Sequence, residues 1–124
     1  VIQNREVKKF KSKAKINLVF RRGKLIKSGS LTLHYINKYH SFQNLEVGVG
    51  ISKKVVISAT RRNRIKRQIN GVIQRHKVEL LNVLPDGLYM IVYKGNFTVN
   101  SDSIWRDLKE LLENLMRKSK SIAQ

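Results

Sequence analysis

One stretch, Lys53–Lys77, places a helical stripe of apolar residues beside a dense set of cations, and this combination most constrains the fold. Nine Lys and Arg residues lie in it, and no acidic residue does. Residues that recur at helical spacing form the stripe: Ile65, Ile69, Val72, Ile73, His76 and Leu80. One face of such a helix must be buried against the domain, while its opposite face presents cations to solvent.

The positive charge of the chain is unevenly distributed. Its 124 residues carry a formal net charge of +18. Residues 1–78 hold 20 of the 26 Lys and Arg residues but only two acids, Glu6 and Glu46, whereas residues 79–124 are balanced. A polyanion is the expected partner, and nucleic acid is favoured over an anionic membrane surface or an acidic protein. Because solvated faces usually mix charges of both signs, the absence of acids from residues 47–78 favours a binding surface.

Composition excludes several classes of protein. There is no cysteine, so disulfides, thiolate metal sites and cysteine nucleophiles are ruled out. No apolar run approaches the roughly 20 residues of a membrane span, so we expect a cytoplasmic protein with no membrane partner. The length fits a single domain over residues 1–124, and we expect a monomer in isolation.

Local patterns predict a short first helix and four strands. Ser12 can cap a helix over Lys13–Arg22, and Gly23 is expected to end it in the left-handed conformation. Alternation or apolar character predicts strands at Lys24–Lys27, Leu31–Tyr39, Leu45–Ile51 and Leu88–Tyr93. The last is almost continuously apolar, so we place it at the centre of the sheet.

Two further helices complete the predicted α-β-β-β-α-β-α order. Ser58 or Thr60 can cap the long basic helix, which we extend to about Leu81, and Asp102 or Ser103 can cap the last one. The last helix buries a stripe of Ile104, Leu108, Leu111, Leu112 and Leu115. We expect a basic extended arm at residues 1–11 and a frayed tail at 117–124. The fold class is α+β, a two-layer α/β sandwich with a four-stranded sheet.

The two faces of the predicted strands differ. Alternation along the strand predicts that Leu31, Leu33, Tyr35 and Tyr39 point toward the core. Thr32 and His34 then lie on the opposite face. Gly48 and Gly50 leave that opposite face bare on the next strand, which favours close approach of another group to the backbone.

Nothing in the sequence indicates catalysis by the protein itself. Its histidines are His34, His40 and His76; the first two have no acid close by in sequence, and we expect the third to pack on the apolar stripe. Paired carboxylates and the HExxH, Walker and GxSxG motifs do not occur. We therefore expect no catalytic residue and no metal site on this chain.

Two adjacent motifs carry a resemblance to a known family. A strand ends in Val47-Gly48-Val49-Gly50-Ile51-Ser52-Lys53-Lys54, and the next helix carries Arg61-Arg62-Asn63-Arg64-Ile65-Lys66-Arg67. The upstream run that ends in Val19-Phe20-Arg21-Arg22-Gly23 and the Pro85-x-Gly87 turn stand in matching order. On these features the chain resembles the protein subunit of bacterial ribonuclease P over about residues 5–117.

The resemblance implies a fold and a function. The family fold is a ribosomal-protein-like sandwich with a left-handed βαβ crossover, an exception to the usual right-handed rule. Ribonuclease P removes the 5′ leader from precursor tRNA; its RNA subunit performs the hydrolysis with Mg²⁺, and the protein supports that RNA and holds the leader. The alternatives are a ribosomal or RNA-chaperone protein without a processing role, and a stand-alone nuclease.

The resemblance also implies two RNA-binding surfaces. The expected contacts with the RNA subunit are Lys53, Lys54, Arg61, Arg62, Asn63, Arg64, Lys66 and Arg67. The expected leader groove lies between the first helix and the sheet, with Ile16, Phe20, Thr32 and His34 as contacts. Ile16 and His34 replace aromatic residues of the family and Asn70 replaces an arginine. Without the family, a core position would be the favoured interpretation of Phe20.

Overall fold

The computed structural model describes residues 6–10, 12–37, 44–95 and 100–123, with side chains as far as Arg117. The predictions made for residues 1–5, Tyr39 and His40 lie outside these ranges. In chain order the elements are β1 (Val7–Lys9), α1 (Lys13–Arg22), β2 (Lys24–Ser28), β3 (Leu31–Ile36), β4 (Leu45–Ile51), α2 (Ala59–Arg75), α3 (Lys77–Val83), β5 (Gly87–Tyr93) and α4 (Ser101–Ala123).

The sheet has five strands in the order β1-β4-β5-β3-β2. The α+β class and the central position of β5 are confirmed, and the predicted count of four strands is one too low. The missed strand is β1, which pairs in parallel with the start of β4, Val7 opposite Leu45. Its three residues include two lysines, so no local pattern distinguishes it from an extended arm. β4 and β5 are adjacent and parallel, so α2 and α3 form the crossover between them; its left hand stays a prediction.

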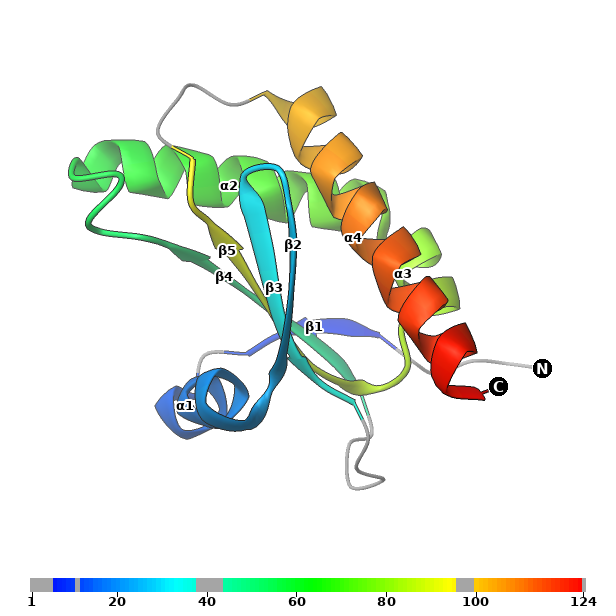
Figure 1. Cartoon of the computed structure of the whole chain (residues 1–124). Coiled ribbons are helices and arrows are strands. Elements are labelled where there is room, and N and C mark those ends of the chain that lie inside the picture. The colour runs from blue at the N-terminus through cyan, green and yellow to red at the C-terminus, as the bar shows by residue number, and fades with distance from the viewer. Residues whose placement is uncertain (1–5, 11, 38–43, 96–99, 124) are drawn as a thin grey trace.

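Helices lie on both faces of the sheet (Figure 1). α2, α3 and α4 cover one face and make the predicted sandwich, with a large buried cluster that includes Leu31, Leu33, Tyr35 and the apolar stripes of α2 and α4. α1 lies on the opposite face, where a smaller cluster contains Phe10, Val19, Ile36, Leu88 and Met90. In the part of the chain that is described, no helix is long and apolar enough to cross a membrane.

The basic helix is shorter than predicted. Ser58 caps it, its side-chain oxygen accepting the backbone N–H of Arg61 at 3.3 Å. It ends at Arg75, because the next residue, His76, leaves the helical region with φ −115° and ψ 24°, and α3 continues from Lys77. No Gly or Pro between residues 72 and 84 marks this break. At the break, His76 lies against α4, where its ring stacks on Trp105 with a ring-centroid distance of 3.6 Å.

One predicted helix end and one predicted cap are wrong in detail. Gly23 follows α1 with φ −77° and ψ 160°, an extended rather than left-handed conformation. A Cβ there would lie 2.3 Å from the carbonyl oxygen of Val19, so glycine is required by close backbone approach. Asn100, not Asp102 or Ser103, caps α4, since its Oδ1 accepts the N–H of Ser103 at 2.8 Å. α4 continues to Ala123, and fraying of the tail stays a prediction.

Candidate nucleic-acid interface

The polar face of α2 is fixed by the burial of its apolar face. Ile65, Ile69, Val72 and Ile73 are buried, so the residues on the other side project to solvent. Among these, the predicted contacts Asn63, Arg64, Lys66 and Arg67 are all exposed. A shallow depression of about 440 Å³ on this face is lined by Thr60, Asn63, Lys66, Arg67 and Asn70. Cations around a concave surface suit phosphate groups, because Arg and Lys donate charged hydrogen bonds.

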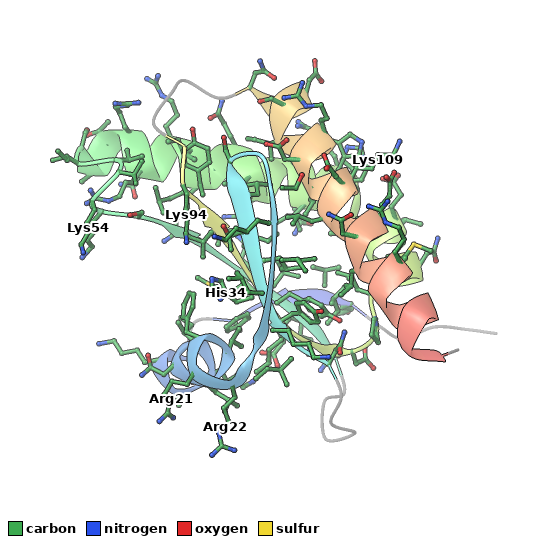
Figure 2. All side chains as sticks on the ribbon, in the orientation of Figure 1. Arg21, Arg22, His34, Lys54, Lys94 and Lys109 are labelled. Atoms are coloured by element: carbon green, nitrogen blue, oxygen red, sulfur yellow. The ribbon has the colours of Figure 1, made fainter. Side chains whose placement is uncertain are left out.

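Three other predicted contacts lie at the N-terminal end of α2. Lys53 and Lys54 belong to the loop that joins β4 to α2, and Arg61 is in the first turn of the helix; all three are exposed. Figure 2 shows Lys54 projecting from this loop. They extend the cationic surface beyond the helix.

Arg62 differs from its neighbours. It is half-buried, and its Nη1 donates hydrogen bonds to the carbonyl oxygens of Val56 at 2.8 Å and Ile57 at 2.6 Å. Helical spacing places position 62 closer to the apolar stripe than to Arg64 or Arg67, a signal that the sequence contains. The structure therefore separates Arg62 from the solvent-facing cations with which the sequence motif groups it.

Two of the predicted leader contacts, Phe20 and His34, touch each other. The Phe20 ring, at the end of α1, meets the imidazole of His34 on β3 edge to face, with centroids 4.5 Å apart and planes inclined by 66°. Phe20 is 44% exposed, so it is not a core residue. A half-exposed aromatic pair offers a surface on which a base can stack.

The other two leader contacts lie apart from this pair. Ile16, one turn before Phe20, lines a groove of about 410 Å³ between α1, β4 and α2. The groove is bordered by Lys9, Phe10, Ile16, Val47, Gly48, Val49, Lys66, Asn70 and Met90. Thr32 is 3% exposed, in register with Lys27 and Val92 on the neighbouring strands. Its side chain is therefore buried, and the structure does not bring it to the surface of the groove.

The glycine face of β4 is not bare. An added Cβ at Gly48 would lie 2.8 Å from the sulfur of Met90 and 3.3 Å from the Phe10 ring. The predicted close approach to the Gly48 backbone is therefore present, and the group that makes it belongs to the protein itself. Gly50 is more open, since the nearest atom to a Cβ added there would be Met90 Cε, at 3.0 Å.

Lysine side chains line the groove and lie near the Phe20–His34 pair, so both carry positive charge. The Nζ of Lys15 on α1 lies 3.0 Å from both carboxylate oxygens of Glu46, so one of the two acids in the basic region is paired. Burial, with Lys94 and Lys27 nearby, lowers the pKa of His34 below its ordinary 6.5. The imidazole is therefore neutral at physiological pH, which suits stacking. Lys27 and Lys94 extend the cationic surface on this side, a feature that strand register reveals and sequence order conceals. Figure 2 labels Lys94 and His34.

The described side chains form no group of three or more His, Asp or Glu residues that could hold a metal ion. The histidines among them are also separated: His34 faces α1, whereas His76 lies between α3 and α4 and contacts Glu79 at 2.7 Å. What the interface offers is positive charge, a groove and an exposed aromatic pair.

These features define a small α+β protein with a cationic surface, suited to a polyanion, formed by a basic helix and the neighbouring sheet face. Residues 5–116 match the family model described as Ribonuclease P. The chain is 32% identical over 111 residues to the "Ribonuclease P protein component" of Rippkaea orientalis, covering 86% of this chain and 85% of that relative. The chain belongs to the ribonuclease P protein family.

Solved structures agree on the fold. The RNase P protein of Staphylococcus aureus superposes with a TM-score of 0.69 at 18% identity, covering 86% of this chain and 94% of that one. The RNase P protein from Thermotoga maritima gives a TM-score of 0.67 at 19% identity, covering 86% and 96%.

Proposed function

We propose that this chain is the protein subunit of a ribonuclease P that removes the 5′ leader from precursor tRNA. The subunit is not the catalyst: it binds the catalytic RNA through the α2 face and the leader through the groove beside α1. Its partners are the ribonuclease P RNA and precursor tRNA, and it works in the cytoplasm. The Mg²⁺ used in hydrolysis is held by the RNA subunit.

One observation carries this proposal: the two RNA-binding surfaces share residues. Lys66 and Asn70 line both the depression on the polar face of α2 and the groove that contains Ile16. A strand of RNA in the groove would therefore lie directly beside RNA bound on α2. This arrangement suits a protein that holds a substrate next to a larger RNA, and a protein with a single RNA contact does not need it.

The groove also suits leaders of varied sequence. Its cationic side chains, Lys9 and Lys66, recognise phosphate in any sequence, and its neighbouring aromatic pair can stack on any base. Ile16 and Met90 supply apolar contacts that carry no hydrogen-bonding code. We therefore expect the protein to bind leaders with little preference for their sequence.

Reconstitution tests the proposal. The full chain is added to a bacterial ribonuclease P RNA at a low Mg²⁺ concentration, where the RNA alone cleaves precursor tRNA slowly. We expect the protein to accelerate release of the leader and to cleave nothing by itself. Cleavage no faster than with RNA alone would favour a ribosomal or RNA-chaperone role, and cleavage by the protein alone would indicate a stand-alone nuclease.

A further inference from the structure

The loop Ser52–Ser58, which joins β4 to α2, has a fixed backbone and an exposed apolar side chain at its end. We infer that this loop is a preformed contact with the RNA subunit, in which Arg62 positions the loop and Ile57 packs against a base or ribose. The inference rests on the proposed function and adds an apolar contact to a surface otherwise described by its charge.

The loop backbone is held at several points. Its first residue, Ser52, donates its N–H to the carbonyl oxygen of Tyr93 at 3.4 Å and accepts the N–H of Val56 at 2.9 Å. Val56 is buried in the main cluster and anchors the middle of the loop. The guanidinium of Arg62 then binds the carbonyl oxygens of Val56 and Ile57. A charged donor that bridges two consecutive carbonyls restricts the backbone more than a single neutral hydrogen bond.

Ile57 is presented to solvent by this restrained backbone. Its side chain is 83% exposed, more than that of any other large apolar residue in the described part of the chain. A single exposed apolar residue is ordinary in a soluble protein. This one, however, lies between Lys54 and Arg61 in a segment without acids. Ordering the loop in advance lowers the entropy cost of burying it in a complex.

The charge around Ile57 indicates the kind of partner. Lys53 and Lys54 precede the residue and Arg61 follows it, all three as exposed cations, so the partner must be anionic and must also expose an apolar surface. Folded RNA meets both conditions, because its unstacked bases and its ribose rings lie between phosphates. The RNA subunit is the RNA that the proposed function already assigns to this end of α2.

Arg62 is a positioning residue on this interpretation. Two of its hydrogen bonds go to loop carbonyls, and it is less exposed than Arg61, Arg64 or Arg67. Its contribution to RNA binding is therefore made through the loop, whereas Arg61 can meet phosphate directly. The two neighbouring arginines thus form an internal pair for comparison.

Ile57→Ala tests the apolar contact. We expect it to weaken binding of the full chain to a bacterial ribonuclease P RNA about tenfold, as burial of such a side chain implies, without changing the dependence of affinity on salt. The matched control is Val78→Ala, which removes another exposed apolar side chain, 63% exposed, on α3. Equal affinities for wild type, Ile57→Ala and Val78→Ala would overturn the inference.

Arg62→Ala and Arg61→Ala test the positioning role. In the free protein, we expect Arg62→Ala to speed hydrogen exchange of the amides of residues 54–57, and Arg61→Ala to leave it unchanged. In RNA binding, Arg61→Ala should reduce the slope of log affinity against log salt by about 0.7–0.9, the loss of one phosphate contact, while Arg62→Ala keeps the wild-type slope. Unchanged loop exchange in Arg62→Ala, or a reduced slope in that variant, would contradict the assignment.

These outcomes can be separated from failure of the proposed function. If the wild-type chain does not bind the RNA or accelerate cleavage, the proposed function fails. If it does both and Ile57→Ala binds equally well, only the inference about the loop fails. Ile57→Ala could instead lose binding to phosphatidylglycerol vesicles and keep full affinity for RNA. That result would make the loop a membrane contact and would also overturn the inference.

Discussion

The two faces of the sheet are covered to different degrees. On the face packed by α2, α3 and α4, the described residues form a continuous cluster of 22 buried side chains. On the face packed by α1, the described cluster has five buried side chains, and beside it lie the groove and the exposed Phe20–His34 pair. The closed face provides stability, and this stability allows the other face to remain partly open for binding.

The largest expected effect is a loss of stability when a buried side chain is removed from the closed face. Leu111→Ala removes a fully buried side chain of α4 and should lower the free energy of unfolding by about 2–5 kcal/mol, through lost burial and the cavity left behind. Denaturant titration measures this change. The control is Leu25→Ala on β2, where the side chain is exposed and the expected loss is below about 0.5 kcal/mol. Similar losses for both leucines would mean that stability is not concentrated on this face.

The polar side of α2 should dominate RNA binding. Arg64→Ala combined with Arg67→Ala should weaken binding of the RNA subunit by roughly 10²-fold, because hydrogen bonds to charged groups contribute about 1.5 kcal/mol or more each. The slope of log affinity against log salt should fall by about 1.4–1.8, the loss of two phosphate contacts.

The control removes the same charge from α4, as Arg106→Ala with Lys109→Ala; Figure 2 shows Lys109 on that helix. Titrations at several salt concentrations compare the two double variants. An equal effect of both pairs would show that binding depends on net charge alone and not on the α2 face.

Phe20→Ala tests the open face directly. We expect it to weaken binding of precursor tRNA by about 1–3 kcal/mol, the contribution of one stacked base, and to leave mature tRNA almost unaffected. Met116→Ala, which changes a similarly exposed side chain on α4, is the control: Phe20 is 44% exposed and Met116 is 42% exposed. Equal losses for precursor and mature tRNA in Phe20→Ala would place the leader elsewhere.

Two glycines should respond in opposite directions. Gly71 lies in the middle of α2, and no atom lies within 4 Å of an added Cβ, so Gly71→Ala should stabilise the protein by about 0.5–1 kcal/mol. Gly48→Ala should destabilise it, since its Cβ would crowd Met90 and Phe10. Thermal unfolding of both variants makes the comparison. A stabilising Gly48→Ala would mean that the α1 side is loosely packed even where it is closed.

The smallest expected effect is a dependence of stability on pH that His34 causes. Because the pKa of His34 is lowered in the folded protein, the unfolded chain binds a proton more readily, and His34 destabilises the fold as the pH falls below about 6.5. Phe in its place keeps an aromatic ring and cannot titrate. The melting temperature of wild type should therefore fall relative to that of His34→Phe between pH 7.5 and 5. A constant difference over this interval would exclude His34 as a contributor.

Much of the fold follows from local pattern. The alternation in Leu45–Ile51, the apolar run of β5 and the stripe of α4 appear in the structure where the sequence predicts them. So do the exposed cations at Arg64, Lys66 and Arg67. Each depends on a short repeat that one buried face is sufficient to produce.

The errors share a physical cause. The pairing of β1, the break at His76 and the filling of the space over Gly48 by Met90 and Phe10 all depend on partners far away in the chain. Burial of Thr32 likewise depends on what packs around it. A residue's type and spacing do not reveal whether a neighbour will occupy its surface.

The sequence by itself determined that a basic helix with one buried face would present cations to a polyanion, because charge and helical period are local properties. Only the tertiary structure decided that Lys66 and Asn70 border the same groove as Ile16, and that Arg62 holds the loop before α2. These relations join α1, the sheet and α2 across long separations in sequence, and the packing of one element against another sets them.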